Sequence, residues 1–149
     1  MTFQKSILAA VVAVTTMAFT APAMADGEIK YRQAVMKSIG GHMGAISGII
    51  KKGTANRANL ITHAQGMADL AGMAATAFPE GSDFGETEAL PVIWEKPEDF
   101  KKAVKMFEDA ASAFNMAAKS DDMAQIGPAF GNLAKTCKNC HENFREKKQ

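Results

Sequence analysis

This chain of 149 residues contains few tryptophan, tyrosine and cysteine residues, and it carries almost no net charge. It has one tryptophan, one tyrosine, two cysteines and three histidines, and its formal net charge at pH 7 is +1. A chain this close to neutral gives no electrostatic case for binding nucleic acid. Alanine, methionine and glycine are frequent instead, and this composition favours closely packed helices over a sheet.

The first 25 residues are typical of a secretory leader. Lys5 precedes an apolar run from Ile7 to Phe19, and Ala23-Met24-Ala25 supplies the small residues at which a signal peptidase cuts. We expect cleavage before Asp26 and export to the periplasm, with residues 26–149 forming one domain. The apolar run is shorter than the ~20 residues of a membrane span, so an uncleaved anchor is the less favoured alternative.

Both cysteines lie near the C-terminus, in the run Cys137-Lys138-Asn139-Cys140-His141. On a helix, residues three and four positions apart share a face, so both thiols and the imidazole can reach one flat macrocycle. This spacing predicts one covalently attached haem c. Cys137 and Cys140 would form the thioethers, and His141 would be an axial ligand of the iron.

Three other interpretations of the cysteine pair are less favoured. A thioredoxin-like redox couple follows a strand in a βαβ unit, and no segment here alternates like a strand. A structural zinc site needs four ligands, and His42 and His63 are the only other histidines. A disulfide between Cys137 and Cys140 would close so short a loop that it would add almost no stability.

Hydrophobic periodicity predicts four helices. The first three span about 28–51, 55–77 and 97–119, and Asp121-Asp122 opens a fourth whose apolar stripe runs from Met123 to Phe144. The links after the first and third helices are short, whereas residues 79–96 form one long connection. These lengths predict an all-α, antiparallel four-helix bundle.

Local signals support these boundaries. Gly53 breaks the chain after the first helix, and Pro97 suits the first position of the third helix. Pro128 predicts a kink in the last helix, unless the regular helix begins there. We expect Trp94, in the long connection, to cover the bundle as part of a loop.

The position of the haem motif resembles that of the cytochrome c′ family (class II cytochromes c). Ordinary mitochondrial-type cytochromes c carry the motif near the N-terminus, whereas here it follows three helices. The resemblance spans essentially residues 28–147. Further matches to the family are Tyr31-Arg32-Gln33, Pro79-Glu80-Gly81, Thr87-Glu88-Ala89 ahead of Ile93-Trp94, and Phe144-Arg145.

The resemblance also identifies a candidate for the second axial position of the iron. A residue of the first helix covers that face in the family. It is a non-coordinating apolar side chain in high-spin members and a ligating methionine in low-spin members. The matching residue here is Met36. Helix geometry supports it, because Met36 lies ~12 Å from the start of its helix and His141 ~9 Å from the end of the last one.

Neighbouring residues fit this position less well. Met43 lies on the same stripe but ~10 Å deeper along the helix axis, and His42 projects about 240° around the helix from Met36. We expect His42 and His63 to be surface or secondary core residues. Met36 remains open to two interpretations, as an iron ligand or as a wall of the distal pocket.

Two arginines belong to the predicted haem environment. Arg32 precedes Met36 by four residues, so its guanidinium could pair with a haem propionate; a solvated arginine is the alternative. The resemblance implies that Arg145 lies over the proximal face of the haem, where it could tune His141. The alternative for Arg145 is a frayed helix end.

The predicted function is that of an exported electron carrier with redox partner proteins, because a Met/His pair is a common cytochrome coordination. The alternative is a five-coordinate haem that binds nitric oxide or carbon monoxide. We expect no enzymatic turnover. The resemblance also implies a possible homodimer through the first two helices, where Gly40, Gly41, Gly44 and Ser47 would permit close contact; packing within one chain would explain these small residues equally well.

Overall fold

The computed structural model describes residues 21–53 and 56–147. Its elements are α1 (Ala21–Lys52), a 3-10 turn η1 (Arg57–Asn59), α2 (Leu60–Ala74), α3 (Val92–Glu95), α4 (Pro97–Lys119) and α5 (Met123–Phe144). Residues 1–20, which make up most of the predicted leader, lie outside the described ranges. The helix α1 begins before the expected cleavage site, so its first turn includes residues that we assign to the leader.

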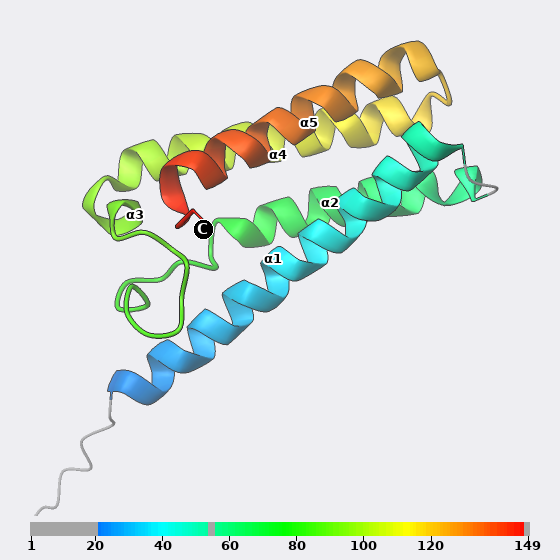
Figure 1. Cartoon of the computed structure of the whole chain (residues 1–149). Helices are drawn as coiled ribbons and strands as arrows, with labels where there is room; N and C mark the ends of the chain where they lie inside the picture. The colour runs from blue at the N-terminus through cyan, green and yellow to red at the C-terminus, as the bar shows by residue number, and fades with distance from the viewer. Residues whose placement is uncertain (1–20, 54–55, 148–149) are drawn as a thin grey trace, which may run out of the picture.

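The four long helices form the predicted antiparallel bundle (Figure 1). The helix α4 packs against both α5 and α2, and α2 packs against α1. The N-terminal half of α1 diverges from α4 and α5, and the connection from α2 to α3 lies at this diverging end (Figure 1). The end of α5 that carries the haem motif therefore lies beside the connection and opposite the N-terminal half of α1.

Several helix boundaries agree with the sequence predictions, but α1 begins at Ala21 rather than near 28, and α2 begins at Leu60 rather than near 55 because the 3-10 turn η1 precedes it. The range of α4 is as predicted, whereas α2 ends three residues earlier than expected, at Ala74. The one-turn helix α3 was not predicted, because four residues are too few to show a period. The side chain of Asp122 accepts a hydrogen bond from the N–H of Ala124 at 2.9 Å and caps α5. Because α5 begins at Met123, the alternative start at Pro128 is wrong.

Two hydrophobic clusters form the core. The larger one joins α1, α2, α4 and α5, and its most deeply buried large side chains are Ile46, Met67, Phe114, Ile126 and Leu133. The smaller one lies at the diverging end and contains Ile93, Phe100, Ala103, Val104 and Phe144. Cys137 packs against the larger cluster and Cys140 against the smaller one. The predicted attachment residues therefore lie where the two clusters meet.

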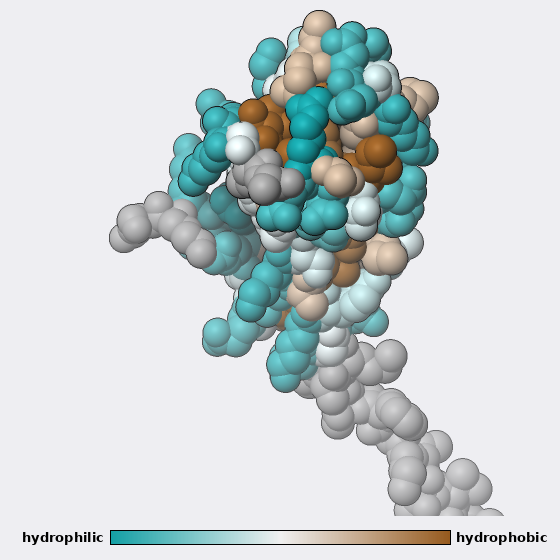
Figure 2. Space-filling view, turned by 90° about the vertical axis from the view of Figure 1, so that its right-hand side faces the viewer, coloured by the Kyte–Doolittle hydropathy of each residue, from teal (hydrophilic) through white to brown (hydrophobic). Residues whose placement is uncertain are grey.

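The surface of the opposite end is mostly hydrophilic. Seen from the side at which α4 turns into α5, hydrophobic residues occupy only small separate areas (Figure 2). Such scattered apolar residues are usual on a protein surface. Within the described ranges, no helix combines the length and apolar character that crossing a bilayer requires.

A buried arginine of α1 holds the connection in place. Arg32 is only 3% exposed, so the solvated alternative is wrong. Its two terminal nitrogens donate to the Ser82 hydroxyl at 2.8 Å, the Ser82 carbonyl at 2.9 Å, the Thr87 hydroxyl at 2.9 Å and the Ala77 carbonyl at 3.4 Å. These four bonds use the four terminal N–H groups of the guanidinium.

Aromatic rings complete the surroundings of this guanidinium. Its central carbon lies 4.9 Å from the centre of the Phe78 ring and 5.8 Å from that of Trp94, within the range of cation–π attraction. Burial lowers the pKa of Arg32, and the negative charge of Glu28 partly offsets this effect. The Trp94 indole donates to the Pro79 carbonyl at 3.0 Å, and the half-buried ring packs against the smaller cluster. Trp94 therefore covers the bundle as expected, but from the short helix α3 rather than from a loop.

We predict that Arg32→Met destabilises the protein strongly. The substitution leaves several buried acceptors of the connection without a donor, and the free energy of unfolding should fall by about 2–4 kcal/mol. Guanidinium denaturation of the purified protein would measure this loss. Gln33→Ala is the matched control, because the exposed Gln33 amide also donates to the connection, at the Glu86 carbonyl. The control should cost less than about 1 kcal/mol, and equal losses in both variants would contradict the assignment.

Candidate cofactor site

A cavity of about 780 Å³ opens between α1, α4, α5 and the connection. Its volume lies within the roughly 300–1,000 Å³ that is typical of ligand and cofactor sites. It brings together all the residues that the sequence predicted for a haem site, namely Arg32, Met36, Cys137, Cys140, His141 and Arg145. Neither His42 nor Met43 lines it, in agreement with the helix geometry.

The α5 wall of the cavity carries the two cysteines. Cys137 and Cys140 are both half-buried free thiols. Burial raises the pKa of the Cys137 thiol, and it raises the pKa of Cys140 to about 11, with a smaller contribution from Cys137 and an opposing one from Arg145. Reactive cysteines of thioredoxin-like sites have lowered pKa values instead. The environment of this pair is therefore unlike that of a redox couple.

His141 lies on the same wall and is half-buried. Burial lowers its pKa, the positive charge of Arg145 lowers it further, and the negative charge of Glu88 opposes both effects. The imidazole is therefore neutral at neutral pH. A neutral ring nitrogen is the form of histidine that binds a metal.

The chain is held firmly just after His141. Ala89 and Arg145 form an isolated antiparallel bridge. The N–H of Leu90 donates to the Phe144 carbonyl at 3.1 Å, and the N–H of Glu146 donates to the Glu88 carbonyl at 2.8 Å. The alternative of a frayed helix end for Arg145 is therefore wrong, although its side chain is exposed. No periodic signal in the sequence indicates this pairing, so sequence reasoning missed it.

The α1 wall carries Arg32, Gln33, Met36, Ile39 and Gly40. Met36 is half-buried and packs against the larger cluster. Met36 thus lies on one wall of the cavity and His141 on another. The thioether of Met36 is flexible and unbranched, so its position on this wall is compatible both with ligating iron and with lining a pocket.

Taken together, the cavity fits a haem c better than a lone metal ion. Two thiols and an adjacent neutral imidazole lie on one wall, and the apolar side chains Ile93, Phe100, Val104, Phe107 and Phe144 line much of the remainder. Within residues 21–53 and 56–147, no group of three or more histidine, cysteine or acidic side chains is placed to hold a metal ion. A macrocycle attached through the two sulfurs would use both the thiols and the apolar walls.

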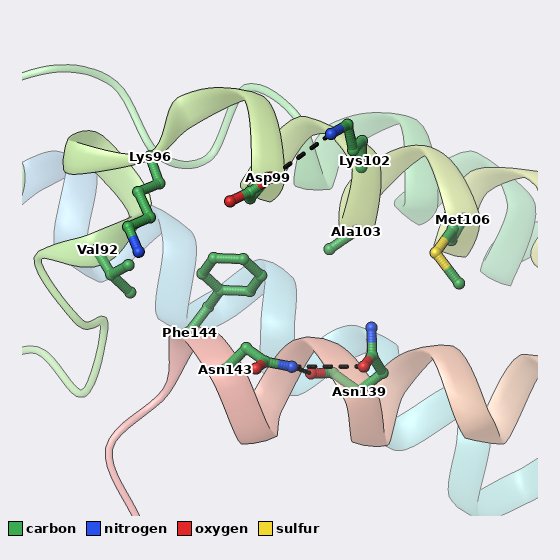
Figure 3. Close-up of a pocket in the computed structure, with 9 residues that line it drawn as sticks. All are labelled: Val92, Lys96, Asp99, Lys102, Ala103, Met106, Asn139, Asn143 and Phe144. Carbon is green, nitrogen blue, oxygen red and sulfur yellow. Dashed lines mark hydrogen bonds and ion pairs between the residues drawn. The ribbon is translucent and has the colours of Figure 1, made fainter.

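A smaller pocket of about 340 Å³ lies between α4 and the end of α5, beside Val92 and Lys96 (Figure 3). Ala103 and Phe144 line both this pocket and the large cavity, so they separate the two spaces. Four of the polar residues around the small pocket are paired with one another, in the bond from Asn143 to the Asn139 carbonyl at 2.7 Å and the ion pair between Lys102 and Asp99 at 3.6 Å. The small pocket contains none of the predicted haem residues.

Sequence comparison places the chain among known haem proteins. The family profile described as cytochrome C′ matches residues 27–145. The chain is 39% identical to the cytochrome c′ of Pararhodospirillum photometricum over 122 residues, which cover 81% of this chain and 98% of that one. It is also 36% identical to cytochrome c-556 of Agrobacterium fabrum over 133 residues, which cover 83% and 84% of the two chains.

Solved structures give the same result. Cytochrome c prime from Shewanella frigidimarina has a TM-score of 0.78 and 35% identity, over 83% of this chain and 97% of that chain. A nitric oxide complex of a cytochrome c prime variant from Alcaligenes xylosoxidans has a TM-score of 0.76, 27% identity and the same coverage. A cytochrome c′ with an unusual ligand-controlled dimer dissociation has a TM-score of 0.77 and 28% identity, again over 83% and 97%.

The sequence profile, the curated relatives and the fold all agree with the arrangement of thiols, imidazole and apolar walls around the cavity. The chain belongs to the cytochrome c′ family, whose members carry one covalently attached haem c.

Proposed function

We propose that this protein binds a diatomic gas, nitric oxide or carbon monoxide, at the haem. The observation that carries the proposal is the likeness to a nitric oxide complex of a cytochrome c prime variant over 83% of this chain. The α1 wall supports it, because Met36 is flexible and only half-buried and can line a pocket without filling it. The sequence alone favoured an electron carrier, and the structural comparison shifts our preference to the alternative.

The residues of the α5 wall would hold the cofactor. In our proposal Cys137 and Cys140 form the two thioether bonds, and His141 binds the iron on the proximal side. The haem then supplies an iron that can take a gas molecule or exchange one electron. The exposed Arg145 would limit access to the proximal face, held there by the pairing of its backbone with Ala89.

Arg32 has a structural role that supports the same site. Its terminal N–H groups are directed to the connection that borders the cavity. The predicted pairing with a haem propionate stays a prediction. A propionate could pair with the fifth donor of the guanidinium, Nε–H, or replace the Ala77 carbonyl, which is the most distant present partner at 3.4 Å.

Electron transfer is the second candidate function, and Met36 is the observation that favours it. Met36 and His141 both line the cavity, and together they would supply the Met/His ligand pair that is common in cytochromes. Redox partner proteins would then be required. In either case we propose binding or transfer rather than enzymatic turnover, because His141 is the only histidine among the described residues that line the cavity.

The leader supports export, and we propose that the mature protein acts in the periplasm. Thiols are kept reduced in the cytoplasm, whereas the periplasm is an oxidising compartment. Covalent attachment of haem through two cysteines therefore fits an exported protein. Cleavage before Asp26 would remove the first turn of α1 and leave residues 26–149 as the cytochrome domain.

We predict that Met36 does not ligate the iron. Near-infrared spectra of the ferric wild type, Met36→Leu and Met43→Leu proteins should all lack a sulfur-to-iron charge-transfer band. Because Met36 would contribute only van der Waals contacts, dissociation constants for nitric oxide should agree within about tenfold among the three proteins. Met43 is the matched control, since it lies on the same helix but outside the cavity. A band in the wild type that disappears only in Met36→Leu would replace this proposal with the electron carrier.

We predict that the haem resists extraction with acidified acetone. Two thioether bonds should keep the pigment with the wild-type polypeptide, and mass spectrometry should show the added mass of one haem. The double variant Cys137→Ala, Cys140→Ala should release any pigment into the solvent, whereas Met43→Leu should retain it. Complete extraction of pigment from the wild type would contradict covalent attachment.

We also propose a homodimer through α1 and α2. Gly41 and Gly44 of α1 are exposed, and a Cβ added to either would meet no described atom outside its own helix within 4 Å. Each glycine in a helix lowers helix stability by about 1 kcal/mol relative to alanine. Packing within one chain does not explain why glycine stands at these two positions. The ligand-controlled dimer of the related cytochrome c′ supports an interface between copies.

Gly44→Leu is predicted to prevent this dimer. Sedimentation equilibrium should show a dimeric wild type and a monomeric variant, because the added side chain blocks close approach of two α1 helices. Gly131→Leu is the matched control, since Gly131 is also exposed and open but lies on α5; it should remain dimeric. A Gly44→Leu protein that dimerises like the control would rule out this interface.

A further inference from the structure

Two histidines from different helices meet outside the haem cavity. The Nδ1 atoms of His42 in α1 and His63 in α2 lie 3.2 Å apart. The two ring centres are 5.2 Å apart, and the ring planes are inclined at 73°. Both side chains are half-buried, and neither lines the haem cavity. In the single chain the pair is therefore partly accessible from solvent, and it is separate from the haem cavity.

A glycine fixes the position of one of these rings. A Cβ added at Gly66 of α2 would lie 2.5 Å from Cε1 of His42, and 3.0 Å and 3.1 Å from its two nitrogens. Real atoms do not approach this closely, so the His42 ring occupies space that only glycine leaves free. Among the described glycines, Gly66 is the one whose Cβ position meets a histidine ring. The imidazole of His42 is thus held against α2, with Nδ1 facing His63.

From this geometry we propose that His42 and His63 form a binding site for a divalent transition-metal ion such as zinc. Two nitrogens 3.2 Å apart, each about 2.0–2.1 Å from one ion, subtend roughly 100° at that ion, near the tetrahedral angle. The ion lies off the line between the two nitrogens. In the contact without an ion one ring donates its Nδ1–H to the other ring; when the ion binds, that ring changes tautomer and carries its proton on Nε2, so that both Nδ1 atoms offer a lone pair.

The ligand set defines the class of ion. Imidazole nitrogen suits zinc, copper and nickel, whereas magnesium and calcium prefer oxygen ligands. Within the described residues, no third histidine, cysteine or acidic side chain joins the pair. Water therefore completes the coordination, as in open zinc sites. Such a site has moderate affinity and exchanges its ion with solvent.

Binding at this position has a mechanical consequence. The two ligands belong to different helices, so the ion connects α1 to α2 at one point along their contact. An ion that binds the folded chain and not the unfolded chain raises the melting temperature in proportion to the logarithm of its concentration. The competing explanation is a plain N–H···N hydrogen bond between the rings, which requires no ion and predicts no such effect.

The test uses the purified haem-containing protein and zinc chloride alone. Isothermal titration calorimetry at neutral pH should show one zinc ion bound per chain in the wild type. His42→Gln and His63→Gln should each weaken binding by tenfold or more. Gly66→Ala retains both imidazoles but displaces the His42 ring, and the loss should be about 10–100-fold, as for other changes that disturb ligand orientation. At a zinc concentration just sufficient to saturate the wild type, the melting temperature should rise in the wild type and much less in these three variants.

Asp69→Asn is the matched control. Asp69 is an exposed carboxylate of α2 that accepts a hydrogen bond from Gln65, and its removal should leave zinc binding unchanged. Circular dichroism of each variant separates loss of ligands from loss of folding, and Gly66→Ala provides an independent variant if a histidine substitution unfolds the chain. Zinc affinity that is the same in the wild type and both histidine variants would overturn the proposal, as would a wild type that binds no zinc.

Discussion

The haem cavity depends on the connection between α2 and α3. This connection links α1 to the end of α5, two helices that make few direct contacts with each other. In the described residues, α1 packs chiefly against α2, and α5 packs against α4. The buried Arg32 of α1 holds the first part of the connection by hydrogen bonds to Ser82 and Thr87. The last part of the connection pairs with the chain just after His141. The connection thus links the two walls of the cavity proposed to hold the cofactor.

The same arrangement is compatible with both proposed functions. The α5 wall is rigid, because it lies between the two core clusters and its end is held by backbone pairing. The α1 wall contributes Met36, a flexible side chain that can line a pocket or offer sulfur to iron. Our two proposed functions, gas binding and electron transfer, therefore differ in the role that they give to Met36 and not in the fold.

The sequence predicted most of the fold and every residue proposed for the site. Long helices such as α4 repeat their apolar pattern over many turns, so their periods are clear. The sequence did not predict the interactions between residues that are far apart along the chain. Arg32 was expected to pair with a haem propionate, yet its partners are 45 to 55 residues away in the connection. The contact between His42 and His63 was missed for the same reason, since each histidine has no distinctive local pattern.

The sequence by itself determined the cofactor, because the spacing of Cys137, Cys140 and His141 is a local property of one helix. It also determined the all-α class, because burial of an apolar stripe follows directly from helical periodicity. Only the tertiary structure decided which partners each polar side chain has. Hydrogen bonds such as those of Arg32, and contacts such as that of His42 with Gly66, form between segments whose relative position is set by packing of the whole bundle.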